Sequence, residues 1–216
     1  MFDAYDVFLF DCDGLLVDTE PLHFEAYRRL CARHGYPLEW DFPTYAQVAH
    51  TSSDGLKKAL SPHLPPPWAD RYQEKRDHYV EILHEGKVRL MPGVEPLLVQ
   101  LAKRGAPRAV VTHSPADHLA LIRSQLPILN TIPEWITRED YVNPKPDPEC
   151  YQMAIERIAE AEDRVIGFED SLRGLTALRG TRAQPVLVTT ADCPPIEGVI
   201  RLASFADVSG RAGGPG

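Results

Sequence analysis

Apolar residues follow two different periods along this chain, and these periods predict strands that alternate with helices. Apolar runs of strand length occur at 5–10, 108–112, 135–136, 164–168 and 185–190. Apolar positions three or four residues apart predict helices after these runs, at 94–104, 115–126, 147–161 and 171–178. Strands that are apolar throughout are typical of a sheet covered on both faces, and helical crossovers join parallel strands. The pattern therefore predicts an α/β fold with a Rossmann-like parallel sheet.

The stretch from about residue 17 to residue 88 differs from the rest because it is helical and contains no predicted strand. Helical spacing occurs at 19–34, 45–60 and 68–84. This stretch interrupts the first crossover, so we interpret it as an inserted α-helical cap. The predicted core domain is 1–17 and 88–216, and the predicted cap domain is 18–87. The tail at 210–216, GRAGGPG, has nothing to bury and is expected to be disordered.

The composition limits the function classes that need to be considered. The chain has 216 residues, of which 44% are hydrophobic and 25% charged, and this excludes a disordered or fibrous protein. Its net charge of −8 and pI near 5.5 argue against a nucleic-acid partner. No apolar run reaches the ~18 residues of a membrane span, and the acidic N-terminus does not resemble a secretory signal. The four cysteines lack metal-ligand spacing, so we expect a cytoplasmic protein with reduced thiols and no membrane partner.

Acidic residues follow two of the predicted strands. Asp11 and Asp13 come directly after the first strand and precede Gly14, which allows a sharp turn. Glu169 and Asp170 close the strand at 164–168. These acids could simply form turns or stabilise helix N-termini, where the helix dipole favours negative charge. Carboxylates also suit Mg²⁺, and two carboxylates this close need a cation or a raised pKa.

A hydroxyl and a lysine occupy comparable positions. Thr112 ends the strand at 108–112, where its hydroxyl could begin a helix or hold an anion. Lys145 lies between two prolines, which restrict where its ammonium can point. A solvated lysine in a stiff loop is the simpler alternative. Because the carboxyl ends of parallel strands meet at one edge of a sheet, we expect these groups to gather there.

The four segments in this order resemble the haloacid dehalogenase (HAD) superfamily, specifically the β-phosphoglucomutase-like group of phosphatases and mutases with a helical cap. The motif D-x-D-G-x-x-x-D-T-E is matched by residues 11–20. Thr112, the K-P-x-P segment that begins at Lys145 and the sequence E-D-S at 169–171 match the other three motifs. The helical insertion also occurs where this group carries its cap. The resemblance covers about residues 5–190.

The resemblance implies a mechanism with two aspartates. Asp11 would be the nucleophile that forms an aspartyl-phosphate, and Asp13 the general acid that later acts as a base. Mg²⁺ would be the cofactor, bound by the Asp11 carboxylate, the Asp13 main-chain carbonyl and Asp170, with Glu169 as a further ligand or acting through a water. An acid at position 13 favours phosphate esters, because an alkoxide leaving group needs a proton and a halide does not.

The resemblance also implies roles for the groups that touch the phosphoryl oxygens. Thr112 would donate a hydrogen bond to one of them, and Lys145 would neutralise the phosphoryl charge and Asp11. Many relatives carry Asn after the hydroxyl, whereas this chain has His113, which could contact substrate or only stabilise the helix start. His23 falls where the mutase has a cap histidine and is a second substrate-binding candidate, although a histidine on an amphipathic helix is often structural.

We therefore expect a Mg²⁺-dependent phosphatase of a small phosphorylated metabolite, with a phosphosugar mutase of the β-phosphoglucomutase type as the alternative and a non-catalytic binding protein as a third reading. The mutase contacts a distal phosphate through a G-x-x-R-like cap loop, and the comparable stretch 49–54 lacks both residues. Ser52, Ser53, Lys57 and Lys58 are cap residues that could face substrate. The cap is expected to close over the core about hinges near 16–18 and 87–90, because a lid is needed to exclude water.

Overall fold

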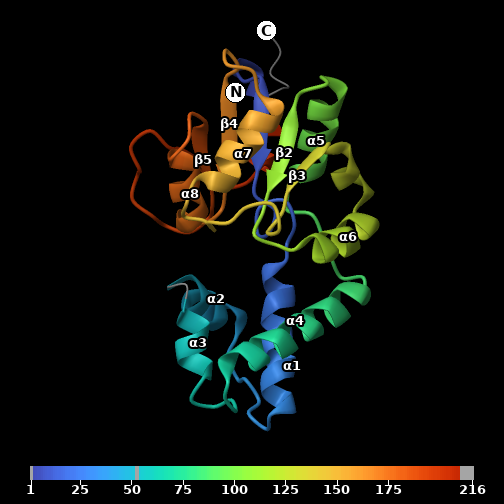
Figure 1. The fold of residues 1–216 in the computed structure, drawn as a ribbon, viewed down its shortest axis with the longest axis vertical. Helices are drawn as coiled ribbons and strands as arrows, with labels where there is room; N and C mark the ends of the chain where they lie inside the picture. The colour runs from blue at the N-terminus through green and yellow to red at the C-terminus, as the bar shows by residue number, and fades with distance from the viewer. Residues whose placement is uncertain (1, 52–53, 210–216) are drawn as a thin grey trace. The chain divides into compact units, whose positions relative to one another are not determined.

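The chain folds into two compact units, seen in a computed structural model that describes residues 2–51 and 54–209 (Figure 1). One unit is Thr19–Val88, and the other consists of Met1–Asp18 together with Arg89–Gly216. We call them the helical unit and the core unit. Two predictions fall outside the described residues. One is that Ser52 and Ser53 face substrate, and the other is that the tail 210–216 is disordered.

The core unit is built on a sheet of six parallel strands in the order β3-β2-β1-β4-β5-β6. The strands are β1 (Val7–Phe10), β2 (Arg108–Val111), β3 (Glu134–Ile136), β4 (Val165–Glu169), β5 (Gln184–Val188) and β6 (Ile200–Leu202). This order confirms the Rossmann-like α/β fold. The chain runs outward from β1 in both directions, so β1 lies at the switch point where such sheets bind ligands.

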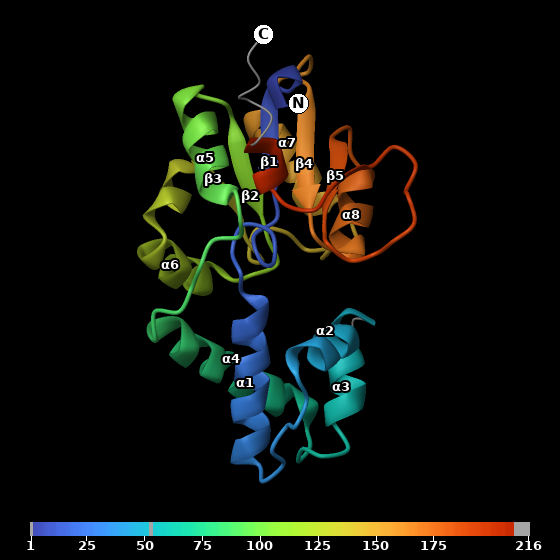
Figure 2. The same cartoon turned by 180° about the vertical axis from the view of Figure 1, so that it is seen from behind.

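Helices cover both faces of this sheet. They are α5 (Val94–Lys103), α6 (Ala116–Gln125), α7 (Glu149–Ile158), α8 (Leu172–Arg179) and α9 (Ala206–Ser209), with 3₁₀ turns at Phe2–Ala4 and Pro127–Thr131. Helix α7 lies in front of the strands in Figure 1 and behind them in Figure 2, whereas α5 lies on the opposite face. Both faces of the central strands are therefore removed from water.

Strand β1 is fully buried because its side chains alternate between two apolar layers. Val7 and Leu9 pack into a cluster with residues of α7 and α8. Phe8 and Phe10 point to the other face, where their rings meet Phe2, Phe168 and Phe205 with centroids 5.1 to 6.4 Å apart. Burial on both faces explains the unbroken apolar run and fixes the end of β1, where Asp11 follows.

The helical unit contains α1 (Glu20–Arg33), α2 (Phe42–Thr51), α3 (Gly55–Leu60) and α4 (Trp68–His84). Its own apolar cluster includes Tyr27, Leu30, Cys31, Leu38, Tyr45, Leu60 and Leu64. The helical spacing predicted over 45–60 corresponds to two helices, α2 and α3, and Gly55 begins the second. The helical unit therefore has an apolar core of its own.

The two chain segments that join the units run side by side at their core ends. Val17 forms an antiparallel bridge with Leu90, and the amide of Asp18 donates to the carbonyl of Arg89 at 2.9 Å. The amide of Met91 donates to the carbonyl of Leu16 at 3.0 Å. The connection is therefore a short hydrogen-bonded ribbon rather than two independent linkers.

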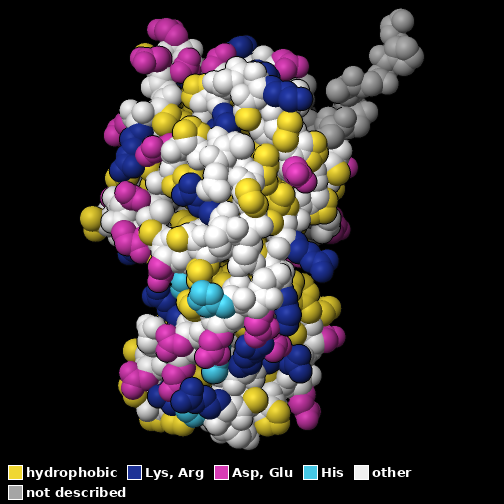
Figure 3. Space-filling model, turned by 90° about the vertical axis from the view of Figure 1, so that its right-hand side faces the viewer, with side chains coloured by type: hydrophobic (Ala, Val, Ile, Leu, Met, Phe, Trp, Pro, Cys, Tyr) yellow, Lys and Arg dark blue, Asp and Glu magenta, His cyan; other side chains and the backbone are white. Residues whose placement is uncertain are grey.

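The surface agrees with the composition. On the face shown in Figure 3, acidic and basic side chains are interspersed and no broad area of Lys and Arg is present. All four cysteines are free. Among the described residues, no helix is both long enough and apolar enough to cross a bilayer.

Candidate active site

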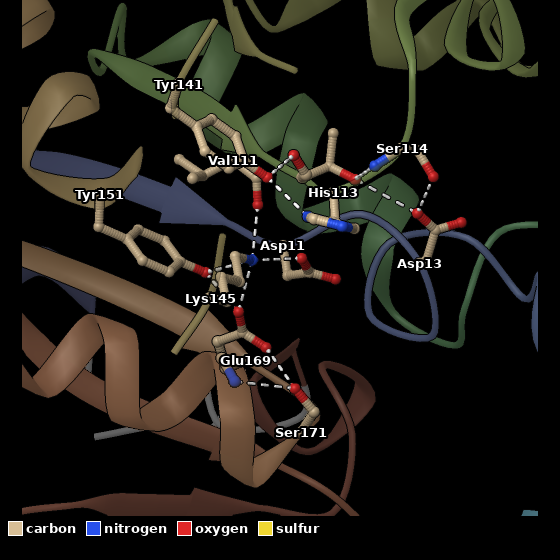
Figure 4. Close-up of polar contacts among 12 residues, drawn as sticks. Asp11, Asp13, Val111, His113, Ser114, Tyr141, Lys145, Tyr151, Glu169 and Ser171 are labelled. Atoms are coloured by element: carbon tan, nitrogen blue, oxygen red, sulfur yellow. Dashed lines mark hydrogen bonds and ion pairs between the residues drawn. The ribbon is translucent and has the colours of Figure 1, made fainter. Parts of the chain in front are cut away.

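The groups expected to be reactive meet at the carboxyl edge of the three central strands. Asp11 follows β1, and Thr112 follows β2. Glu169 is the last residue of β4, and Asp170 follows it. Lys145 reaches the same place from the loop that precedes α7 (Figure 4). Parallel register places these strand ends next to one another, as expected. The structure thus brings four sequence segments that lie far apart in the chain into one polar cluster.

Lys145 is the centre of this cluster and is buried. Its Nζ lies 2.6 Å from Oδ1 of Asp11 and 2.7 Å from Oε1 of Glu169. It also donates to the carbonyl of Val111 at 2.9 Å and approaches the hydroxyl of Tyr151 at 3.2 Å. Three ammonium protons are therefore shared among four acceptors, and the lysine holds a fixed position between the two acids.

The carboxylate of Glu169 is held from several sides. Its Oε1 accepts a hydrogen bond from Tyr151 at 2.6 Å in addition to the one from Lys145. Its Oε2 accepts from the hydroxyl of Ser171 at 3.3 Å. A Cβ at Gly174 would lie 1.9 to 2.2 Å from the carboxylate atoms, so only glycine fits beneath it. Because Oε1 already serves two donors, we expect Glu169 to act mainly as an anchor for Lys145.

Burial controls the protonation of the two partners at the centre. Burial raises the pKa of Asp11 well above its usual value, Lys145 lowers it, and the carboxyl groups of Glu169, Asp170 and Asp13 raise it further. For Lys145, burial lowers the pKa, but the charges of Asp11 and Glu169 overcome this and raise it well above its usual value. Lys145 is therefore a permanent cation, and a further cation would help to keep Asp11 ionised.

The acidic residues fit a divalent cation. Asp11, Glu169 and Asp170 each offer a carboxylate oxygen within 4.8 Å of the others. Gly14 has a φ of 77°, and a Cβ there would lie 2.3 Å from Oδ2 of Asp170. Glycine thus permits both the turn and the close approach of this carboxylate. A cluster of carboxylate oxygens is the donor set that Mg²⁺ prefers.

Asp13 is oriented by two hydroxyl groups. Its Oδ2 accepts hydrogen bonds from Ser114 at 2.6 Å and from Thr112 at 3.3 Å. The amide of Ser114 in turn donates to the hydroxyl of Thr112 at 3.0 Å. Thr112 must therefore exchange Asp13 for a phosphoryl oxygen if it contacts substrate. The sequence analysis missed Ser114, although a second hydroxyl two residues after Thr112 was a visible signal.

His113 is fixed as a neutral tautomer at the edge of the cluster. The hydroxyl of Tyr141 donates to the carbonyl of Thr112 at 3.0 Å and lies 3.0 Å from Nδ1 of His113. Since Tyr141 has only one proton, Nδ1 must donate to it, which leaves Nε2 as an acceptor. Partial burial, together with the charges of Arg173, Arg138 and Lys145, lowers the pKa of His113 to about 4, against an opposing effect of Asp13.

Three described residues of the helical unit, His23, Lys57 and Lys58, are candidates for contact with substrate. His23 stacks on Tyr79 with ring centroids 4.1 Å apart, and its Nδ1 accepts from Nζ of Lys75 at 2.8 Å. Lys57 lines a pocket of about 190 Å³, whose other walls are Tyr27, Ala49, Asp54, Leu56, Trp68 and Tyr72. Lys58 is exposed. These contacts give His23 a structural role, and its contact with substrate stays a prediction.

A family model described as haloacid dehalogenase-like hydrolase matches residues 5–180. The match includes all four strand-end segments described above and more than half of the chain. The chain belongs to the haloacid dehalogenase-like hydrolases. This confirms the family resemblance seen in the motifs at Asp11, Thr112, Lys145 and Glu169.

Named relatives of this HAD-family chain include phosphatases. A probable pseudouridine-5'-phosphatase of Drosophila melanogaster is 31% identical and aligns with 83% of this chain and 80% of its own length. A phosphorylated carbohydrates phosphatase of Thermotoga maritima is 29% identical over 79% of each chain. The crystal structure of CbbY from Rhodobacter sphaeroides in complex with phosphate matches with a TM-score of 0.78, 25% identity and coverage of 94% and 96%. The family and these relatives confirm that the chain is a phosphoric monoester hydrolase.

Proposed function

We propose that this HAD-family phosphatase hydrolyses a small phosphorylated metabolite through an aspartyl-phosphate on Asp11, with Mg²⁺ as cofactor. The observation that carries the proposal is the pairing of a buried Asp11 with Lys145 at the switch point of the sheet, 2.6 Å apart. A buried carboxylate held at a strand end by a permanent cation is oriented for attack on phosphorus. A surface turn would need neither the burial nor the lysine.

In the first step, a carboxylate oxygen of Asp11 attacks phosphorus, and the bond from phosphorus to the alcohol oxygen breaks. Asp13 gives its proton to the departing oxygen, so the product leaves as a neutral alcohol. Ser114 holds Asp13 through its Oδ2, while Thr112 exchanges its contact with the same oxygen for one with a phosphoryl oxygen. Lys145 offsets negative charge on Asp11 throughout.

In the second step, Asp13 takes a proton from water, and the water oxygen attacks the phosphorus of the aspartyl-phosphate. The bond from phosphorus to Asp11 then breaks, which releases inorganic phosphate and restores the Asp11 carboxylate. The same residue therefore serves as acid and then as base, and it begins the next cycle protonated. Each step moves one proton and one phosphoryl group, so the cycle balances.

Mg²⁺ would be held by the carboxylates of Asp11 and Asp170 and by the main-chain carbonyl of Asp13. When bound, it supplies positive charge that offsets the phosphoryl oxygens and the surrounding acids. Glu169 supports this set by holding Lys145 and Ser171, with both of its oxygens accepting hydrogen bonds.

The substrate class is a phosphorylated carbohydrate or nucleoside, as in the names of the two relatives. The pocket of the helical unit supports this assignment because its aromatic residues Tyr27, Trp68 and Tyr72 suit sugar or base rings, and Lys57 suits an oxygen-rich ligand. We assign this unit the role of a cap that selects the leaving group. The ribbon at Val17 and Leu90 would be its hinge. We expect its hydrogen-exchange protection to change when beryllium fluoride binds with Mg²⁺, and unchanged protection with the mimic bound would contradict this role.

The direct test is a screen of phosphorylated metabolites with Mg²⁺, scored for inorganic phosphate and for isomerised product. We expect phosphate release that stops on chelation and returns with added Mg²⁺. Asp11→Asn, which keeps the size of the side chain but cannot form the acyl phosphate, should abolish turnover and remain folded. Formation of an isomer that depends on a sugar bisphosphate activator would instead identify a mutase, and turnover by Asp11→Asn would exclude Asp11 as nucleophile.

A further inference from the structure

Lys145, the central cation of the candidate active site, lies on an exposed loop at residues 142–148. Among these seven residues only Lys145 is buried. Val142 at the start of the loop has 78% of its surface exposed, so its side chain does not anchor the loop in the apolar core. The prolines at 144, 146 and 148 have no amide proton to donate. The path of the loop therefore depends on a small number of hydrogen bonds to its main chain.

Glu149 accepts two of these hydrogen bonds. Its Oε1 accepts from the amide of Val142 at 2.8 Å, and its Oε2 accepts from the amide of Asn143 at 2.8 Å. One carboxylate thus joins the end of the loop to two consecutive amides at its start, with Lys145 between them. These amides hold the pKa of Glu149 below its usual value, and an ionised acceptor forms stronger hydrogen bonds than a neutral one.

The chain on either side of this loop is anchored at the site. Tyr141, directly before the loop, donates to the carbonyl of Thr112 at 3.0 Å. Tyr151, in the first turn of α7, donates to Glu169 at 2.6 Å. Glu149 lies between these two anchors and closes the segment that connects them. Its carboxylate therefore sets the path of the chain from which Lys145 extends.

A simpler role for Glu149 is an acid at a helix start. It is the first residue of α7, where the helix dipole favours negative charge whatever the side chain contacts. That role needs only the charge. The two hydrogen bonds to the loop also need the length of the side chain, because both oxygens must reach the amides of Val142 and Asn143. The two roles can therefore be separated by substitution.

We propose that Glu149 is a positioning residue, which closes the loop and so holds the ammonium of Lys145 between Asp11 and Glu169. This inference rests on the proposed function, in which Lys145 offsets the charge on Asp11 during phosphoryl transfer. The Nζ of Lys145 lies 2.6 Å from Asp11 and 2.7 Å from Glu169. A displacement of about 1 Å would lengthen both contacts, and such a displacement can reduce a rate by up to about 100-fold. Glu149 thus acts on the reaction through Lys145.

Two substitutions of Glu149 separate loop closure from charge. Glu149→Asp keeps the charge at the start of α7 but is one methylene too short to serve both amides. Glu149→Gln keeps the length and one acceptor oxygen, but it places an NH₂ donor where the other oxygen was. With p-nitrophenyl phosphate and Mg²⁺, each should lower kcat about tenfold. Glu156→Asp, the same shortening at an exposed position of α7, is the matched control and should change kcat by less than about twofold.

The ammonium of Lys145 gives a second measurement that does not depend on turnover. An ammonium that is buried and hydrogen-bonded exchanges its protons slowly with water, so it gives a ¹H–¹⁵N NMR signal. Lys145→Met assigns this signal by removing it. We expect exchange with water to be about tenfold faster in both Glu149 variants and unchanged in Glu156→Asp. Faster exchange together with a lower kcat is the result that the proposal predicts.

Three results would overturn it. A loss confined to Glu149→Gln would show that only the charge at the helix start matters. A lower kcat with unchanged exchange at Lys145 would show that Glu149 does not act through this lysine. An unchanged kcat in both variants would show that turnover does not need the closed loop. If wild-type enzyme releases no phosphate from any ester, the proposed function fails, whereas exchange at Lys145 still shows whether Glu149 holds it.

Discussion

The hydroxyl of Tyr151 donates to Oε1 of Glu169 at 2.6 Å, the same oxygen that accepts from Lys145. The contact joins the first turn of α7 to the end of β4. It lets the helix that covers one face of the sheet support the residue that anchors the central cation. Burial raises the pKa of Tyr151 well above its usual value, so it remains a donor.

Tyr151→Phe should therefore weaken both the fold and the reaction. Removing one hydrogen bond to a buried carboxylate is expected to lower the free energy of unfolding by about 1–3 kcal/mol. Turnover should fall about tenfold because Lys145 and Glu169 lose a fixed partner. Denaturant unfolding and steady-state kinetics measure the two effects, with Tyr5→Phe as the control. Unchanged values in both experiments would show that the hydroxyl positions nothing.

Lys145→Met should make stability strongly dependent on pH. Loss of the cation leaves Asp11 and Glu169 buried together, which costs about 3–5 kcal/mol at neutral pH. It also removes the effect that lowers the pKa of Asp11, so the folded state favours the protonated acid. When the pKa of an acid is higher in the folded state than in the unfolded state, its protonation stabilises the folded state at low pH. This contribution to the free energy of unfolding is lost as the pH rises.

Unfolding of Lys145→Met at pH 5 and at pH 8, with a chelator present, checks this expectation. The variant should be closer to wild type at pH 5 than at pH 8. Lys103→Met, which removes an exposed lysine at the end of α5, should show no such difference. A deficit that is equal at the two pH values would contradict the buried pairing of Lys145 with the acids.

The hydrogen bond from Ser114 to Asp13 predicts a graded pair of variants. Asp13→Asn removes the acid and base and should lower kcat by about 10²–10⁴-fold. Ser114→Ala leaves Asp13 in place but removes its 2.6 Å contact, so a loss of about tenfold in kcat is expected. Steady-state kinetics on one ester measure both. Ser114→Ala in the Asp13→Asn background should add little, and a full additional loss would show that Ser114 acts independently of Asp13.

His113 should remain neutral across the physiological pH range. Its pKa is lowered to about 4, so the C2 proton resonance should stay constant between about pH 5.5 and 8.5. Because the unfolded chain binds a proton near the usual pKa, the contribution of His113 to stability should decline as pH falls from about 6.5 towards 4. Arg173→Gln should raise this pKa by removing one of the charges that lower it. A resonance that titrates near the ordinary value in wild type would contradict the environment assigned to His113.

The strand ends could be predicted because strong local patterns determined them. VFLF is unbroken by any polar residue, so the end of β1 and the position of Asp11 followed from the pattern alone. Parallel strands place their carboxyl ends together, so Thr112 and Glu169 could be assigned to the same edge. By contrast, β6 could not be predicted, because the exposed Arg201 lies between two partly buried residues and the strand therefore contains no apolar run.

Contacts across elements could not be predicted in the same way. In the sequence, Tyr151 is one more apolar position of the helix that forms α7. Only the packing of α7 on the sheet shows that its hydroxyl donates a hydrogen bond to Glu169. Spacing along the chain contains no information on such neighbours, because it arises from how separate elements pack.

The central claim is that phosphate transfer passes through Asp11, and trapping the intermediate tests it most directly. Enzyme quenched with acid during turnover with Mg²⁺ is reduced with borohydride, which converts an acyl phosphate to homoserine, and its peptides are sequenced by mass spectrometry. We expect homoserine at position 11 in wild-type enzyme quenched during turnover, and none without substrate or in Asp11→Asn. Intact aspartate at position 11 together with a phosphoryl group on another residue would contradict the account.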